Sequence, residues 1–336
     1  MFQRCRSFCF NVLRLQTSHA QLRCSSILSK AEVKERRNQI FEKEKKRQRD
    51  LVGRIEKIEV NYKSPVEEIT LVMNKYLSTP ADCAKHISEG VVRVSAIALV
   101  DDFPWDMHRP LVSDCRLQLV NMKSPKNNIA NIAFWRTCSF LLGAMIESAF
   151  KSDVQVHLHS FPVPHIKSGN FVYDVYLDLP DWKPTDQEMR AMSAQFVKLI
   201  NQELPIERIE ITEEIALDMF QDNPFKFQQI PDIARANDDK ITLYRVGDHI
   251  DISKGPMVGN TSLIGRCTIA VVHKLPNSDN IYRFQAIALP KGILLNHYAY
   301  SILENRARKL NEMRWMPQMV DEEVIESPPI EMSASN

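Results

Sequence analysis

The most apolar stretch of this chain runs from Ile132 to Phe150 and has a clear helical period. Its apolar side chains form two interleaved rows at three- and four-residue spacing, the pattern of one broad buried helix face. The charged residues Arg136 and Glu147 leave only ten uncharged positions between them, well under the roughly 20 needed to cross a bilayer. The pattern therefore predicts a long core helix, around which the rest of the chain packs, and no membrane span.

Length and charge set limits on the rest of the chain. With 336 residues and 44% hydrophobic content, the chain can bury a substantial core, and we expect two domains with tails. Residues 1–29 contain four arginines and no acid, so the remaining 39 basic and 42 acidic residues give the body a net charge of −3. A body of this charge cannot attract nucleic acid through its overall field, so any such contact must come from a local patch.

The residue types that carry most enzyme and metal chemistry are sparse or scattered. The chain has nine glycines, and none forms a phosphate-cradling loop or a nucleophile elbow. His157 and His159 would share one face of a strand, but a metal ion would need further ligands, and ordinary exposed or hydrogen-bonded histidines are the other interpretation. Seven cysteines occur without a C-x-x-C pair, which favours reduced, mostly buried thiols in an intracellular compartment. They are Cys5, Cys9, Cys24, Cys83, Cys115, Cys138 and Cys267. We expect no cofactor and no metal.

Both ends of the chain differ in composition from a packed domain. Residues 1–29 mix arginines with phenylalanines and leucines, which predicts an amphipathic mitochondrial presequence, with a disordered basic start as the alternative. Residues 313–336 are acidic and rich in proline and serine, which predicts a disordered tail.

A highly charged helical extension is predicted over residues 30–57, and it contains the densest basic cluster of the chain. The cluster comprises Lys43, Lys45, Lys46, Arg47 and Arg49. One interpretation is an arm whose cations replace counterions on the phosphates of an RNA. The other is a solvated helix whose acids offset part of the charge, and the pattern favours neither.

Residues 58–122 predict a small unit in which one helix crosses a sheet of about four strands, an α+β arrangement. Thr79 and Pro80 provide the cap and first residue of that helix. The stretches T-P-A-D-C-A-K-H-I-S and A-L-V-D-D-F-P-W-D-M resemble the ubiquitin-like (β-grasp) domain of threonyl-tRNA synthetases, some GTPases and stringent-response enzymes. The resemblance implies an accessory RNA- or protein-contacting module. Asp101 and Asp102 stand where that family usually has a glycine turn.

Residues 129–312 predict a larger α/β fold, with an antiparallel sheet around the central helix. Helices are expected over residues 185–204, 211–220 and 300–312, and the first begins with a capping box at Thr185 and Glu188. From about residue 55 to 310 the chain resembles the N-terminal half of threonyl-tRNA synthetase. W-R-T-C-S-F-L-L-G-A matches the family motif R-H-S-C-A-H-L-L-G, and D-I-S-K-G-P-M-V matches D-M-C-R-G-P-H-V.

In that family, two histidines of the first motif and the Cys and His of the second line the pocket that hydrolyses mischarged tRNA. This chain has Arg136, Phe140, Ser253 and Met257 at those positions. A guanidinium repels a divalent ion, a phenyl ring has no lone pair and a thioether is a poor zinc donor. None of the four titrates near neutral pH, so none can act as a general base there. The resemblance implies a degenerate editing pocket, and the chain ends where the aminoacylation domain would begin.

This combination resembles a family of structural proteins of the mitochondrial large ribosomal subunit. The resemblance implies a location in the mitochondrial matrix, contacts with other large-subunit proteins, peripheral contact with mitochondrial rRNA, and no small-molecule substrate. Two alternatives remain open. A trans-acting hydrolase of mischarged tRNA would need a rearranged site built from Asp251, His249 or His165. A free matrix RNA-binding or regulatory factor would use the same modules without belonging to the ribosome.

Overall fold

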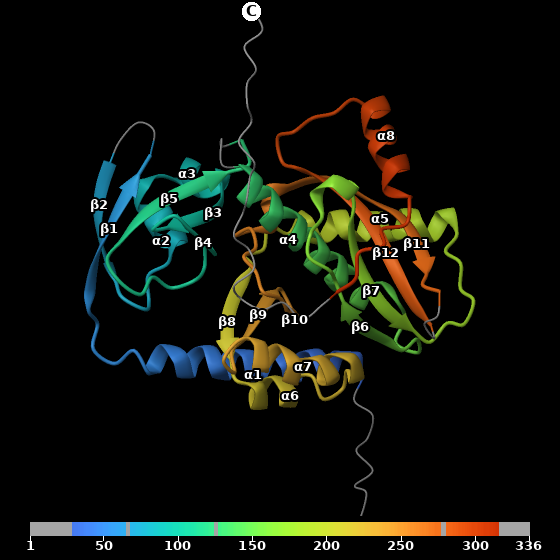
Figure 1. The fold of residues 1–336 in the computed structure, drawn as a ribbon, viewed down its shortest axis with the longest axis horizontal. Coiled ribbons are helices and arrows are strands. Elements are labelled where there is room, and N and C mark those ends of the chain that lie inside the picture. The colour runs from blue at the N-terminus through green and yellow to red at the C-terminus, as the bar shows by residue number, and fades with distance from the viewer. Residues whose placement is uncertain (1–28, 65–67, 124–126, 277–279, 316–336) are drawn as a thin grey trace, which may run out of the picture.

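The computed structural model describes residues 29–64, 68–123, 127–276 and 280–315 (Figure 1). The expected presequence, apart from Ser29, and nearly all of the expected acidic tail lie outside these residues. The described part is α+β, as the sequence predicts, and its strands form three sheets.

The first sheet has the strand order β2-β1-β5-β3-β4, and only the β1–β5 pair is parallel. Its strands are β1 (Lys57–Lys63), β2 (Glu68–Asn74), β3 (Ser95–Val100), β4 (Phe103–Trp105) and β5 (Cys115–Asn121). Helices α2 (Pro80–Ile87) and α3 (Glu89–Val94) pack beside it. Thr79 caps α2 as expected, whereas α3 has no counterpart in the sequence prediction. Asp101 and Asp102 both have positive φ, 50° and 70°, and so make the tight turn that glycine usually makes.

The central helix α4 (Asn127–Ala149) joins the first sheet to the rest of the molecule. Phe134, Leu141 and Leu142 on α4 belong to the same buried cluster as Ala96 and Leu99 of the first sheet. Residues 128–149 are long and apolar enough to span a membrane, but 78% of the most apolar window is buried inside the fold. The helix therefore packs as the core rod that its sequence predicts.

The second sheet is antiparallel, with the order β11-β12-β7-β6. It comprises β6 (Val156–Ser160), β7 (Phe171–Leu177), β11 (Ile264–Lys274) and β12 (Ile281–Pro290). Helix α5 (Asp186–Ile200) packs against it with α4, and α8 (His297–Ala307) contacts β11 and β12. The 3-10 turns η1 (Ile166–Ser168) and η2 (Thr261–Leu263) link these elements.

The third sheet, β10-β9-β8, is flanked by the first helix of the described residues. Its strands are β8 (Glu207–Ile211), β9 (Ile241–Val246) and β10 (His249–Ile252), and its helices are α6 (Glu213–Met219), α7 (Pro224–Ala236) and α1 (Lys30–Asp50). In Figure 1, α1 lies along the bottom of the molecule beside α6 and α7. The expectation that the basic helix extends to Lys57 is wrong, because α1 ends at Asp50 and β1 begins at Lys57.

Candidate functional site

The four positions of the expected editing pocket lie on two elements that meet in the core. Arg136 and Phe140 are on α4, and Ser253 and Met257 are on the loop that follows β10, residues 253–259. All four side chains are buried. An Arg136 Nη1–H donates to the carbonyl oxygen of Pro256 at 3.3 Å, so the guanidinium joins the helix to the loop. The Phe140 ring lies 5.1 Å from the ring of His249, centroid to centroid, and 6.4 Å from that of Tyr244.

A carboxylate from the first sheet enters this region and fixes the loop. Asp106, directly after β4, accepts a hydrogen bond from the backbone N–H of Met257 at 2.8 Å. It also accepts the Tyr244 hydroxyl at 2.9 Å and lies 3.3 Å from Nε of Arg208. Burial and the neighbouring Asp106 carboxylate raise the pKa of Tyr244 well above its usual value, so the phenol keeps its proton. Asp106 is therefore an internal anchor and has no free oxygen to offer a substrate.

The residues next to Asp106 close the far end of the same loop. The His108 ring donates from Nε2 to the carbonyl oxygen of Gly259 at 2.9 Å, and burial lowers the pKa of His108, which favours the neutral ring. A Cβ at Gly259 would lie 2.8 Å from the Cβ of Met107, so only glycine permits this contact. The backbone N–H of Gly259 donates to Ala96, the second residue of β3. The first sheet thus fills the space beside the loop with packed side chains.

Asp251, one of the candidates for a rearranged hydrolase, is committed to a buried ion pair. Its Oδ1 lies 2.6 Å from the ammonium of Lys226 on α7, and the two side chains are 1% and 4% exposed. The Tyr173 hydroxyl donates to the other carboxylate oxygen. Burial and Asp251 raise the pKa of Tyr173 well above its usual value, so Tyr173 is a donor. With both oxygens occupied, this carboxylate cannot activate a water molecule.

His249 is tied to Glu147 and, through it, to α1. The His249 Nδ1–H donates to Glu147 Oε2 at 2.9 Å, and Arg37 of α1 donates to Glu147 Oε1 at 3.2 Å. Lys34 adds a second cation from α1, 3.8 Å from Glu147. His165 is exposed on the loop that leads into η1, and within the described residues no hydrogen bond or ion pair joins its side chain to Asp251 or His249. Asp251 and His249 therefore serve separate structural roles, and His165 joins neither of them.

Because of the contacts of Glu147, we expect the free energy of unfolding to depend on pH in the acid range. Burial alone would raise its pKa, but the His249 hydrogen bond and the charges of His249, Arg37 and Lys34 outweigh burial and lower the pKa to about 2. Because this pKa is below its unfolded value, the stabilisation is present above pH 4.5 and is lost as the pH falls towards 2. We expect the difference in unfolding free energy between wild type and Glu147→Gln to shrink by about 3 kcal/mol over that range. Urea denaturation at stepped pH measures this, and a difference that stays constant would contradict it.

Metal-binding groups are not gathered anywhere in the described part of the chain. Within residues 29–64, 68–123, 127–276 and 280–315, no cluster of three or more His, Cys, Asp and Glu is placed to hold a metal ion. His159 hydrogen-bonds to Ser160, and His157 lies against the ring of Tyr176. The four described cysteines are free and buried. Burial raises the pKa of Cys83 and Cys267 to about 12, which leaves little thiolate at neutral pH.

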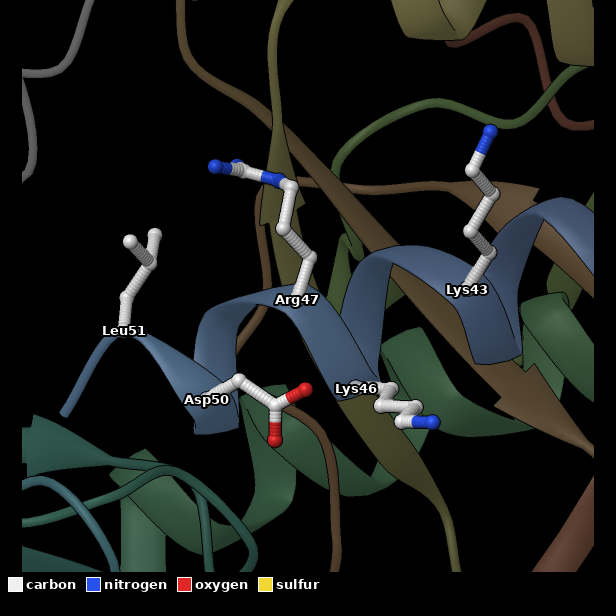
Figure 2. A pocket seen from close by; sticks show the side chains of 5 residues that line it. All are labelled: Lys43, Lys46, Arg47, Asp50 and Leu51. Atoms are coloured by element: carbon white, nitrogen blue, oxygen red, sulfur yellow. The ribbon is translucent and has the colours of Figure 1, made fainter. Parts of the chain in front are cut away.

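The five cations of the basic cluster lie on the C-terminal half of α1 and divide into two groups. Lys45 forms an ion pair with Glu207 of β8, and Arg47 donates to Glu44 at 2.6 and 2.7 Å. The other three, Lys43, Lys46 and Arg49, are exposed and form no ion pair within the described residues. Figure 2 shows Lys43 and Lys46, with Arg47, Asp50 and Leu51, around a shallow hollow on the helix surface.

Sequence reasoning found the four pocket positions but missed the residues that fill and brace them. Asp106 bonds to Met257, 151 residues later, and Lys226 on α7 pairs with Asp251 on β10, and their own neighbours in sequence give no sign of either contact. Arg37 is a second case, because nothing in the charged pattern of α1 separates it from the solvated cations. In the sequence, the Gly255-Pro256 dipeptide shortly after Asp251 marks this loop, but nothing there indicates which residues pack against it.

Comparison with known proteins finds sequence similarity to a TGS domain and to threonine–tRNA ligases. Residues 72–121 match the model of the TGS domain. The chain is 32% identical over 191 residues to "Threonine--tRNA ligase, mitochondrial 1" of Arabidopsis thaliana, which covers 56% of this chain and 25% of the ligase. It is 29% identical over 187 residues to "Threonine--tRNA ligase" of Thermotoga maritima, covering 55% of this chain and 27% of the ligase. The chain thus matches about a quarter of the length of each ligase.

The fold and these matches define a protein that contains a TGS domain and shares part of its chain with threonine–tRNA ligases. The "Large ribosomal subunit protein mL39" of Drosophila melanogaster is 50% identical over 283 residues, which are 83% of this chain and 85% of that protein. The chain belongs to the mL39 family of large ribosomal subunit proteins.

Proposed function

We propose that this chain is a structural constituent of the large subunit of the mitochondrial ribosome and catalyses no reaction. It works in the mitochondrial matrix, where it supports translation through contacts with neighbouring ribosomal proteins and limited contact with rRNA. The name and identity of the Drosophila relative support the ribosomal role. The observation that supports the non-catalytic part is a hydrogen bond: the Asp106 carboxylate accepts the backbone N–H of Met257, one of the four positions of the expected editing pocket.

The chemistry of the pocket supports this proposal step by step. The histidines and cysteine that line the pocket in editing enzymes are replaced by Arg136, Phe140, Ser253 and Met257, which bind no metal and accept no proton at neutral pH. The Asp251 carboxylate, which the sequence suggested as a base, is paired with Lys226, and Met107 beside the first sheet packs against Gly259 of the loop. A substrate would have to displace buried side chains that already satisfy one another.

An exposed apolar surface supports the part of the proposal that concerns protein neighbours. Leu294, Tyr298 and Ile302 are 93%, 76% and 52% exposed, and Ile293 and Leu295 beside them are 39% exposed. Tyr298 and Ile302 are four residues apart on α8, so they share a helix face. Exposed apolar side chains grouped in this way mark protein contacts, and four of these five are aliphatic, which suits another protein of the subunit better than RNA.

Sedimentation tests this role. In a sucrose gradient at moderately high salt, the chain should travel with the large subunit. The variant Leu294→Ser/Tyr298→Ser/Ile302→Ser should lose at least about tenfold of that association, because buried apolar anchors contribute roughly 1–3 kcal/mol each at an interface. Its melting temperature should stay near that of wild type, since all three side chains face solvent. The matched control Val72→Ser/Phe103→Ser removes exposed apolar groups from the first sheet and should sediment like wild type.

Two results would overturn the proposed function. Hydrolysis of mischarged tRNA by the purified chain would identify a working editing site and favour the trans-acting hydrolase. Wild-type chain that remains at the top of the gradient would favour a free matrix factor, because a loosely held cationic protein is released steeply as salt rises.

A further inference from the structure

Some cations of α1 have hydrogen-bond or ion-pair partners within the described residues and others do not, and those that form no ion pair lie on one exposed surface of the helix. The helix carries nine lysines and arginines. Six of them have partners within the described residues: Lys30, Lys34, Arg36, Arg37, Lys45 and Arg47. The remaining three, Lys43, Lys46 and Arg49, form no ion pair there and are all exposed. Two thirds of the cations of this helix therefore take part in contacts within the protein, and the remaining three form one short exposed row.

The row is held rigidly because the opposite side of the helix is packed. Phe41 is fully buried against the third sheet and its helices, and Arg37 is 5% exposed. The Arg37 guanidinium bridges Glu147 of α4 and Asp222, and the Gln48 side chain donates to the carbonyl oxygen of Glu210 in β8. A helix fixed at both halves presents its outer side chains at constant spacing, about 4.5 Å along the axis for every third residue.

The outer face is polar as well as cationic. Lys43 and Lys46 line the hollow of about 380 Å³ seen in Figure 2, and Leu51 stands at its C-terminal end. No apolar or aromatic side chain separates the three cations along the helix, so the face has neither the apolar centre of a protein interface nor a ring on which a base could stack. Such a face suits the phosphate backbone of an RNA, contacted without reading its sequence.

We propose that Lys43, Lys46 and Arg49 form a phosphate-binding face on which an RNA backbone lies, with Asp50 limiting its strength. The inference rests on the proposed ribosomal function and names the kind of partner that this part of the surface takes. Each cation that meets a phosphate releases condensed counterions, so the contact makes binding depend on salt. Of the other two cations in the same basic cluster, Lys45 joins the helix to Glu207 of β8, and Arg47 pairs with Glu44 one turn earlier on α1 itself.

The test is a salt titration with a defined probe, mitochondrial large-subunit rRNA transcribed in vitro. Binding of the purified full chain is measured from 50 to 200 mM KCl. The variant Lys43→Gln/Lys46→Gln/Arg49→Gln should lower the slope of log affinity against log salt by about 2 to 3, since each phosphate contact contributes roughly 0.7–0.9. Its affinity at low salt should fall at least about tenfold.

Two control variants make the result specific. Lys183→Gln/Arg190→Gln/Lys198→Gln removes three other exposed cations that form no ion pair within the described residues, so it makes the same change in net charge elsewhere. Its slope should equal that of wild type. Asp50→Asn removes the acid beside the row and should raise the affinity at low salt.

The outcomes separate this inference from the proposed function. If wild type sediments with the large subunit but the α1 triple variant keeps its slope, the phosphate face is wrong and the ribosomal role stands. If the triple variant loses affinity for polyglutamate and not for the rRNA transcript, the face binds an acidic protein and the RNA assignment is overturned. If wild type binds the transcript with the expected slope but never sediments with the subunit, the ribosomal role fails while the phosphate face stands.

Discussion

The variant Lys226→Met should destabilise the fold by about 3–5 kcal/mol, because Asp251 would remain as a buried carboxylate without a cation. The two groups are 4% and 1% exposed, so solvent screens little of their interaction. Methionine keeps most of the lysine volume, so the loss reports charge and not a cavity. Urea denaturation followed by circular dichroism measures the change.

A double substitution provides the control for this expectation. In Lys226→Met/Asp251→Asn the uncompensated charge is gone, while the amide can still accept the Tyr173 hydroxyl. Replacing a buried ion pair with neutral groups is often close to neutral in stability, so most of the loss should be recovered. A single variant that costs under about 1 kcal/mol would show that Asp251 is not held by Lys226 and would leave it available as a base.

The variant Asp106→Ala should have an effect of similar size and should also loosen the first sheet from the rest of the molecule. It removes the acceptor of the Tyr244 hydroxyl and of the Met257 N–H, and it leaves Arg208 without its nearest buried carboxylate. Each buried donor left unpaired costs about 1–3 kcal/mol, and the cation costs more, so we expect about 3–5 kcal/mol in total. Calorimetry should show a broader transition or two transitions in place of one.

The matched control for Asp106 is Asp114→Ala. Asp114 lies in the connection leading into β5 and accepts one backbone N–H, that of Glu59, at the surface. An exposed contact of this type contributes about 1 kcal/mol or less, so a single transition close to that of wild type is expected. Equal losses in the two variants would mean that Asp106 is an ordinary surface acceptor and not the anchor of the loop.

Periodicity and local capping predicted much of this fold. The apolar rows of α4 identify a buried helix without further information, and the Thr79 and Thr185 caps begin their helices where the sequence places them. Other elements left no such trace. β8 is only five residues long, and three of these are charged, whereas α7 contains Pro231 in its interior, where local propensity predicts a break. Their formation depends on the third sheet and on α1.

The sequence predicts which editing residues are missing from the candidate site, but it does not predict which residues pack in their place. Motif comparison identifies Arg136 and Met257 because each position has a known counterpart in the editing family. No motif indicates that Asp106 would bond to Met257, because the first sheet reaches this loop across 151 residues of chain. Burial of Arg37 was equally hidden, since a charged residue becomes part of a core only when its partners are brought to it from elsewhere in the chain.

The position of α1 has a consequence for how the polypeptide reaches its native state. The helix is early in the chain, yet Arg37 pairs with residues 110 and 185 positions later, and Lys34 with one 214 positions later. Contacts of such long sequence separation form slowly, because a large loop must close before they stabilise anything. A newly made or newly delivered chain would therefore hold this helix unpaired until Glu147, Asp222 and Asp248 had emerged, and holdase chaperones have their longest opportunity to bind during that interval.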